Sequence, residues 1–229
     1  MYRIDHCENL IHFTKGSDKS LDYEKAYENL KKIVSEQTIV GSTGMILGKL
    51  KCVCFTESPV RCLTNSGQLD THYFSRYTPF GIQLPKKTVF NFGGRPAIYS
   101  LRSEYEHIKQ IDEVNWRYVS YDPNLDGDLD FTWEREWRIR TDNIIIDPNE
   151  AKLVFPNIDW INRFIDEHER DFHGVDIDDD CEECYCTREA TILNFTDFLQ
   201  EGQCEYLTGT CPDPSKFPWI LINMNEVTK

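Results

Sequence analysis

No stretch of this 229-residue sequence approaches the roughly 18 consecutive apolar residues that a membrane-spanning helix requires, and the N-terminus lacks the pattern of a secretory signal peptide. We therefore expect a cytoplasmic protein without a membrane partner. A basic excess is also absent, because 39 acidic and 25 basic residues give a net charge of −14. This charge argues against general binding to phosphate backbones, which requires a basic surface, and leaves only a local basic groove open. The chain has no internal repeat and no long low-complexity tract.

The number of cysteines is odd, since the chain has nine, so they cannot all form disulfide pairs within the chain. Four of them lie among apolar segments, namely Cys7, Cys52, Cys54 and Cys62. In a reducing compartment such cysteines are typically buried free thiols, so we do not expect a disulfide framework.

Short apolar strands outnumber helices in the first two thirds of the chain. A helical period of apolar residues, with Asp22 as the N-cap, predicts a helix over residues 23–35, and a second short helix is predicted over 104–111. This mixture predicts an α+β fold over residues 1–156, with mixed or antiparallel sheets and a few flanking helices. The strands are expected at residues 2–4, 10–14, 50–55, 80–84, 97–101, 116–121 and 144–146.

The character of the chain changes beyond Pro156. The spacing of four apolar residues predicts an amphipathic helix that ends near His168. These residues are Ile158, Ile161, Phe164 and Ile165. An acidic run at 176–183 and a remainder rich in cysteine, proline and aromatic residues follow. We therefore expect residues 157–229 to form a small helical and cysteine-rich C-terminal appendage.

Residues 131–140 alternate charged and aromatic side chains in a way that predicts a strand. Its core-facing side would carry Trp133, Trp137 and Ile139 together with Arg135. The opposite side would present two carboxylates followed by two guanidinium groups, from Glu134, Glu136, Arg138 and Arg140. A simpler interpretation is a solvated strand face with weak, exposed ion pairs.

Two other segments carry polar groups suited to a small ligand. His12 and Thr14 alternate with Phe13, so a ring nitrogen and a hydroxyl would lie on one side of a strand. Ser58 follows a buried strand, where hydroxyl and backbone amide groups are available to a ligand. The alternatives are a hydrogen-bonded structural histidine and an ordinary turn that Ser58-Pro59 begins. Together with residues 134–136, these segments could assemble around one small molecule.

The order of these segments resembles the ADP-ribosyltransferase superfamily, in particular the DarT-like toxins and the AbiGi family of bacterial abortive-infection proteins. The resemblance covers about residues 1–150. It is carried by Ile-His-Phe-Thr at 11–14, Asn-Leu-Lys-Lys-Ile at 29–33, Cys-Phe-Thr-Glu-Ser-Pro at 54–59, Pro-Phe-Gly-Ile at 79–82, Gly-Arg-Pro-Ala-Ile-Tyr at 94–99 and Trp-Glu-Arg-Glu-Trp-Arg at 133–138. DarT-like toxins also use an arginine on the N-terminal side of the fold, and no equivalent is evident in this sequence.

The resemblance implies an ADP-ribosyltransferase-like domain with NAD as its substrate. Glu136 would be the catalytic carboxylate, Ser58 would support it, and Glu134 would face or orient the acceptor. His12 and Thr14 would hold the adenosine-side ribose or the nicotinamide amide. For Arg95 we infer a contact with the pyrophosphate, because a planar guanidinium fits phosphate oxygens.

The implied reaction breaks the nicotinamide–ribose bond and transfers ADP-ribose to a macromolecular acceptor, which could be protein, DNA or RNA. Positive charge develops on the ribose as the bond breaks, and an ionised glutamate stabilises that charge. We therefore expect Glu136→Gln to abolish transfer and to leave the fold intact. The setting would be bacterial anti-phage defence or a toxin–antitoxin pair. The alternatives are a non-catalytic antitoxin that binds a cognate toxin, whose basic surface would suit this acidic chain, and a sensor that binds NAD without cleaving it.

Two candidate metal sites have weaker support. Residues 122–130 match much of a calcium-binding EF-hand loop, but position twelve is Trp133 instead of glutamate, so a polar turn is the preferred interpretation. Cys181, Cys184 and Cys186 could bind structural zinc with a fourth ligand, but a second close cysteine pair is missing, so free thiols are preferred. The candidates for that fourth ligand are His168, His173, Cys204 and Cys211.

Overall fold

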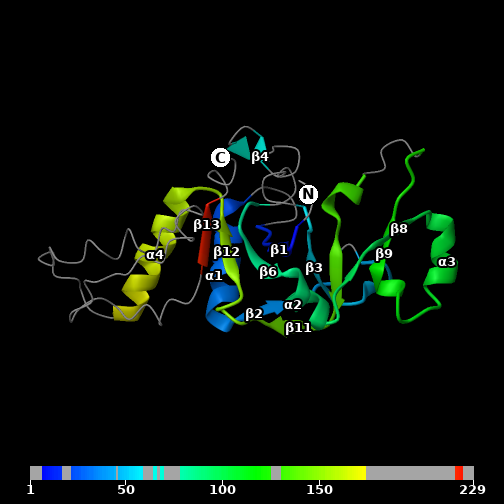
Figure 1. Cartoon of the computed structure of the whole chain (residues 1–229), viewed down its shortest axis with the longest axis horizontal. Helices are drawn as coiled ribbons and strands as arrows, with labels where there is room; N and C mark the ends of the chain where they lie inside the picture. Colours follow the sequence, from blue (N-terminus) through cyan, green and yellow to red (C-terminus); the bar gives the residue numbers. More distant parts are fainter. Residues whose placement is uncertain are drawn as a thin grey trace, which may run out of the picture.

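The computed structural model describes residues 7–16, 22–44, 46–58, 64–65, 68–69, 78–124, 130–173 and 220–223. This part of the chain is an α+β structure with several small sheets and few helices, which confirms the predicted fold class at this level (Figure 1). The helices are α1 (Tyr23–Glu36), α2 (Lys86–Asn91), α3 (Tyr105–Ile108) and α4 (Ile158–His173). The strands are β1 (Asn9–Phe13), β2 (Thr38–Val40), β3 (Cys52–Phe55), β4 (Thr64–Asn65), β5 (Gln68–Leu69), β6 (Gly81–Pro85), β7 (Arg95–Pro96), β8 (Ile98–Ser100), β9 (Tyr118–Ser120), β10 (Trp137–Arg140), β11 (Asn143–Ile145), β12 (Lys152–Phe155) and β13 (Ile220–Asn223).

Two sheets form the body of the molecule. The first has the strand order β1-β6-β12-β13, in which β12 and β13 are parallel and the other pairs are antiparallel. The second is antiparallel, with β10 between β3 and β7. Reciprocal backbone hydrogen bonds between Ile11 and Thr56, at 3.0 and 2.8 Å, join β1 of the first sheet to the end of β3 in the second. The two sheets therefore meet where β1 and β3 lie side by side.

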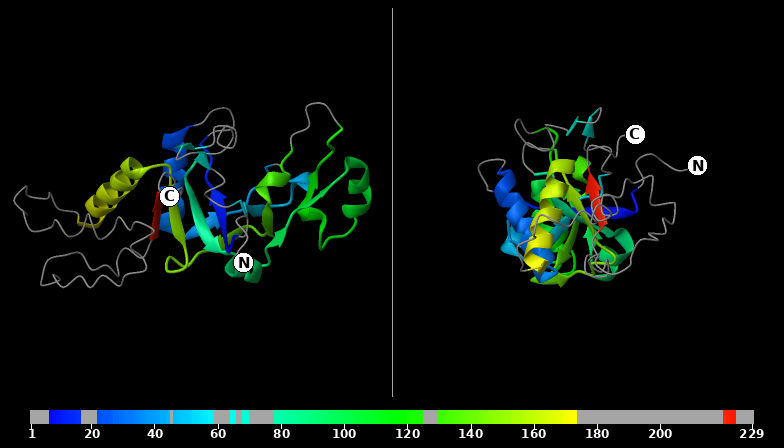
Figure 2. Two further views of the ribbon diagram at one scale, coloured as in Figure 1. Left: turned by 45° about the horizontal axis from the view of Figure 1, so that its top comes forward. Right: turned by 90° about the vertical axis from the view of Figure 1, so that its left-hand side faces the viewer.

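One hydrophobic core joins both sheets to α1 and α4. Fully burying one large apolar side chain, such as leucine, isoleucine or phenylalanine, stabilises a fold by about 1.5–3 kcal/mol. Figures 1 and 2 show α4 and α3 toward opposite ends of the described part of the chain, with the two larger sheets between them. The core includes Leu10, Tyr27, Leu30, Ile82, Leu84, Trp137, Ile139, Leu153, Phe155, Ile161 and Phe164.

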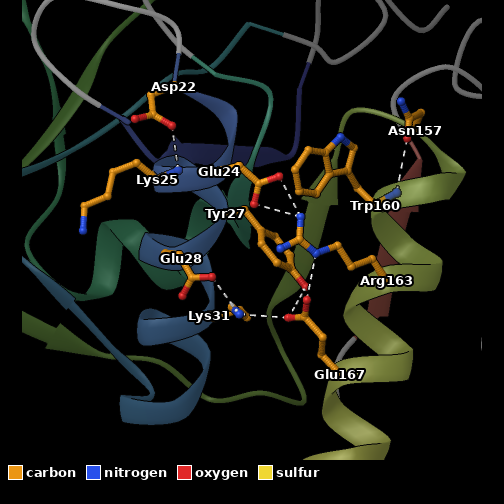
Figure 3. A network of polar contacts seen from close by, with 10 residues as sticks. All are labelled: Asp22, Glu24, Lys25, Tyr27, Glu28, Lys31, Asn157, Trp160, Arg163 and Glu167. Carbon is orange, nitrogen blue, oxygen red and sulfur yellow. Dashed lines mark hydrogen bonds and ion pairs between the residues drawn. The ribbon is translucent and has the colours of Figure 1, made fainter.

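A network of charged side chains fastens α4 to α1 (Figure 3). Arg163 of α4 binds both carboxylate oxygens of Glu24 at 2.8 Å and donates from Nε to Glu167 at 2.7 Å. Glu167 also accepts hydrogen bonds from Lys31 and from the Tyr27 hydroxyl. Partial burial would raise the pKa of Glu167, but these three donors outweigh it and lower the pKa to about 2.

The described parts of residues 157–229 belong to this same body. Ile161, Phe164 and Ile165 of α4 lie in the common core, and β13 pairs with β12. The helix ends at His173, five residues beyond the predicted end near His168. Whether the remainder of 157–229 forms a separate appendage stays a prediction, because residues 174–219 lie outside the described residues.

The predicted strand over residues 131–140 is shorter in the structure. Only Trp137–Arg140 form a strand, whereas Thr132–Glu134 form a 3₁₀ turn and Arg135 is left-handed, with φ 49°. The Asp130 carboxylate accepts hydrogen bonds from both the backbone N–H and the hydroxyl of Thr132. Such local side-chain contacts compete with strand pairing, so the alternation in the sequence extends beyond the strand itself.

Candidate functional site

The three segments that were predicted to assemble around a ligand lie next to one another. β3 has β1 on one side and β10 on the other, and Cys54 in β3 stands opposite Arg138 in β10. His12 contacts the backbone of Cys54 through its ring, with 2.8 Å between Nδ1 and the carbonyl oxygen. The Cys54 thiol lies against the Glu136 carboxylate. His12 and Glu136, which are 124 positions apart in sequence, therefore both contact one residue.

The end of β3 holds the turn that carries Glu134. The Thr56 hydroxyl donates to the carbonyl of Glu134 at 2.6 Å, and the Ser58 hydroxyl donates to the carbonyl of Trp133 at 2.6 Å. The Ser58 N–H in turn donates to the Thr56 hydroxyl at 3.1 Å. Because a serine hydroxyl has a single proton, Ser58 positions the backbone of this turn, and its donor is not available to the Glu136 carboxylate.

Glu136 forms a buried ion pair with Arg138. Arg138 donates from Nε and Nη2 to the two carboxylate oxygens at 2.8 and 2.9 Å, and from Nη1 to the carbonyls of Trp116 and Tyr118 at 3.0 and 2.9 Å. Arg138 is 3% exposed, and the Glu136 side chain is 14% exposed. Burial alone would lower the pKa of Arg138, but the carboxylate raises it above its ordinary value, so the residue stays a cation.

This geometry corrects the simpler interpretation of the charged face. Weak, exposed ion pairs were the alternative, and the pair of Arg140 with Asp112 fits that description, with side chains 38% and 75% exposed. The Glu136–Arg138 pair is instead enclosed by the second sheet and the segment 116–118. In a region of low dielectric constant each of its charges depends strongly on the other.

Two neutral side chains complete the surroundings of Glu136. The phenol oxygen of Tyr99 accepts the backbone N–H of Glu136 at 3.1 Å. Burial raises the pKa of Tyr99 to about 12, and the nearby Glu136 and Glu134 carboxylates add to the shift. Burial and the Glu136 charge also raise the pKa of Cys54 well above its ordinary value. Both side chains are thus protonated at neutral pH, and neither adds a charge beside the carboxylate.

His12 and Thr14 occupy different environments. The Cys54 carbonyl can only accept, so His12 donates from Nδ1 and its neutral ring presents Nε2 as an acceptor. Burial lowers the pKa of His12, and the charge of Lys15 acts in the same direction, which favours the neutral ring. Thr14 is 4% exposed, and its hydroxyl lies within hydrogen-bond distance of the carbonyls of Ala26 and Phe80, at 3.0 and 3.2 Å. Thr14 therefore links β1 to α1 and β6, and its contact with NAD stays a prediction.

Arg95 lies beside the ion pair but turns away from it. It stands opposite Arg138 in the pairing of β7 with β10. Its Nη1 donates to the carbonyls of Gly94 and Phe90 at 2.6 and 3.1 Å, and its guanidinium lies 3.9 Å from the centroid of the Phe90 ring. These contacts stabilise the bend between α2 and β7, and a contact with pyrophosphate stays a prediction.

Glu57 is a central polar residue of this region that the sequence reasoning missed. Its carboxylate accepts hydrogen bonds from Lys86, Arg135 and the indole N–H of Trp137 at 2.7, 2.6 and 2.8 Å. Burial would raise the pKa of Glu57, but these donors outweigh it and lower the pKa. The only signal in the sequence was its position inside the 54–59 segment, since nothing there identifies partners 29 to 80 positions away.

Lys86 and Trp137 also border an open depression of about 690 Å³ near this carboxylate. None of the predicted site residues lines it. Its walls are formed by Cys7, Glu8, Asn9, Pro85, Lys86, Lys87, Phe90 and Trp137.

The described residues hold no cluster of three or more His, Cys, Asp or Glu side chains arranged to bind a metal ion. The cysteines at 181, 184 and 186 and residues 125–129 of the loop at 122–130 lie outside the described residues, so both metal hypotheses stay untested. Cys7, Cys52 and Cys54 are free thiols, as predicted, and Cys62 lies outside the described part. Among the helices that the structure describes, none is both long and apolar enough to cross a bilayer.

Comparison of the chain with models of known protein families, with curated proteins and with solved structures finds no match. The resemblance to ADP-ribosyltransferases therefore stays a prediction that rests on the residues quoted for it.

Proposed function

We propose that this chain is an NAD-dependent ADP-ribosyltransferase-like protein of bacterial anti-phage defence, which transfers ADP-ribose to a macromolecular acceptor. The observation that carries the proposal is the convergence on Cys54. The ring of His12 contacts its carbonyl and the carboxylate of Glu136 contacts its thiol, so a neutral acceptor nitrogen and an anion border the same strand. A ribose with two hydroxyl groups fits such a combination.

In this proposal Glu136 acts on the reacting sugar. Each carboxylate oxygen has two lone pairs, and Arg138 uses one on each oxygen. A ribose 2′-hydroxyl would donate to a remaining lone pair of this carboxylate, whose side chain is 14% exposed. The negative charge would then stabilise the oxocarbenium-like sugar as nicotinamide leaves. Fixed electrostatic groups of this kind typically contribute about 3–4 kcal/mol to transition-state stabilisation.

The other residues would bind and orient the reactants. The Nε2 atom of His12 would accept a ribose hydroxyl or an amide N–H, because Nδ1 is already a donor to Cys54. Ser58 would hold the turn of Glu134, and Glu134 would orient the acceptor. Arg95 would reach the pyrophosphate by leaving its contact with Phe90. Thr14 would contribute indirectly, by fixing the position of β1, which carries His12.

The test measures nicotinamide release from NAD and the incorporation of labelled ADP-ribose into bacterial cell extract. Wild type is compared with Glu136→Gln and with the matched control Glu167→Gln. The control makes the same change in a glutamate that also pairs with an arginine, but on α4 and outside the site. We expect Glu136→Gln to lose at least about 100-fold in rate and the control to stay near wild type. Equal rates for wild type and Glu136→Gln would contradict the proposal, as would the absence of turnover in wild type.

A second candidate is a non-catalytic partner of a defence or toxin–antitoxin system. The observation that favours it is that Arg138 engages both oxygens of Glu136, while the hydroxyls of Ser58 and Thr14 and the Nη1 group of Arg95 are engaged by backbone carbonyls. NAD binding by calorimetry without nicotinamide release would indicate a sensor. The absence of both NAD binding and nicotinamide release would indicate a partner-binding role. The net charge of −14 would then suit a partner with a basic surface.

A further inference from the structure

Arg138 is held in a fixed orientation by three separate elements. It projects from β10, and four of its five N–H groups donate to acceptors within the protein. The carbonyls of Trp116, in the 3₁₀ turn Asn115–Arg117, and of Tyr118, at the start of β9, fix the plane of the guanidinium. The two remaining contacts are to Glu136.

A bidentate contact transfers this fixed orientation to the carboxylate. Because a guanidinium is a planar fork, two parallel hydrogen bonds hold the carboxylate nearly in the same plane. The backbone of Glu136 is fixed as well, since its N–H donates to the Tyr99 hydroxyl and its carbonyl accepts from Ala97 N–H at 2.7 Å. Both ends of the Glu136 side chain are thus determined by neighbouring residues.

We infer that Arg138 and Tyr99 are positioning residues of the proposed site, which orient the Glu136 carboxylate toward the ribose 2′-hydroxyl without touching NAD. The inference rests on the proposed function. A misplacement of about 1 Å in a reacting group can cost roughly 100-fold in rate, so the orientation of this carboxylate would matter for the chemical step. It would matter much less for the affinity of the protein for NAD, since neither residue contacts the substrate.

The test uses two conservative variants of the full chain and one control. Arg138→Lys keeps the charge but loses the planar fork, and Tyr99→Phe removes only the phenol oxygen. Arg140→Lys is the control, because Arg140 follows on the same strand and pairs with the exposed Asp112. Nicotinamide release is measured at several NAD concentrations, well below the thermal midpoint of each variant, and rates are corrected for the folded fraction from circular dichroism.

We expect kcat to fall by about 100-fold in Arg138→Lys and by about 10-fold in Tyr99→Phe, with KM for NAD within about twofold of wild type. Arg140→Lys should keep both constants. A purely structural role would lower the folded fraction and leave the corrected kcat unchanged. That result in Tyr99→Phe would overturn the inference even where Arg138→Lys folds poorly, and so would a rise in KM at constant kcat. If wild type releases no nicotinamide, both the proposed function and this inference are contradicted. If wild type is active and the variants are unaffected, only the inference is contradicted.

Discussion

Replacing Glu136 by glutamine should destabilise the protein, in addition to removing the activity proposed above. From the sequence alone Glu136→Gln was expected to leave the fold intact, because glutamine keeps the shape of glutamate and loses only its charge. In the structure Arg138 is 3% exposed and Glu136 is the carboxylate that neutralises it. Glutamine would leave a buried guanidinium cation facing a neutral amide, whose NH₂ group cannot accept a hydrogen bond.

The expected loss follows from the burial of the pair. Removing one partner of a buried ion pair typically costs about 3–5 kcal/mol, because the other charge is left without compensation. The amide oxygen of glutamine would still accept one N–H, which returns about 1 kcal/mol. We therefore expect a decrease of about 2–4 kcal/mol in the free energy of unfolding. In a protein of this size that corresponds to a fall of roughly 5–15 °C in the thermal midpoint.

Urea unfolding at pH 7, followed by circular dichroism, measures this loss for wild type, Glu136→Gln, Arg138→Met and the double variant. The double variant has no unpaired charge, so the cycle should give a coupling free energy of at least about 1.5 kcal/mol. The control is Glu36→Gln, whose exposed contact with Lys32 spans 3.9 Å and should contribute less than about 0.5 kcal/mol. If Glu136→Gln unfolds at the urea concentration of wild type, or if the coupling is near zero, the buried Glu136–Arg138 pair does not stabilise the fold.

Two further stability predictions concern carboxylates with lowered pKa values. Glu167→Gln should cost about 1–2 kcal/mol at pH 7, a figure reduced for solvent screening because the side chain is 24% exposed. Since the pKa of Glu167 is lowered from 4.5 to about 2, its contribution is complete above pH 4.5 and is lost as the pH falls toward 2. Urea unfolding at pH 7, 4 and 2.5 should show the stabilities of wild type and Glu167→Gln converging as the pH falls. A difference that stays constant with pH would contradict the lowered pKa of Glu167. Glu57→Gln should cost about 2 kcal/mol at pH 7, because Lys86 and Arg135 lose a shared anion, and this difference should also shrink as the pH falls below 4.5. A Glu57→Gln variant as stable as wild type at pH 7 would show that these contacts add nothing.

Features that depend on neighbouring residues were predicted well. The helix expected over 23–35 is α1, Tyr23–Glu36, and the Asp22 side chain accepts the Lys25 N–H as an N-cap should. Within residues 136–140 the predicted alternation holds, with Trp137 and Ile139 in the core. Hydrophobic period and capping act over a few residues, so the sequence contains the information directly.

Features that depend on residues far apart in the chain were not predicted from the sequence. The turn at Thr132–Glu134 is held by hydroxyl groups of Thr56 and Ser58, which lie 75 to 78 positions earlier in the chain. No local pattern predicts that these donors are available there. For the same reason the sequence indicated an exposed charged face where the structure has a buried pair.

The sequence by itself predicted helix α1, the start of α4 and strands β1, β3 and β6, and it placed Trp137 and Ile139 in the core. It did not predict α2 or β12, and Trp133, which was expected to face the core, is 38% exposed. Tertiary structure alone decided what each polar group contacts. In the folded protein His12 donates from Nδ1 and presents Nε2 as an acceptor, and the hydroxyls of Ser58 and Thr14 donate to backbone carbonyls. Glu57 accepts hydrogen bonds from three donors, and Glu136 forms a buried ion pair with Arg138. The physical reason is that hydrogen bonds and ion pairs act over a few ångströms, and distances between segments far apart in the chain exist only after the two sheets have packed together.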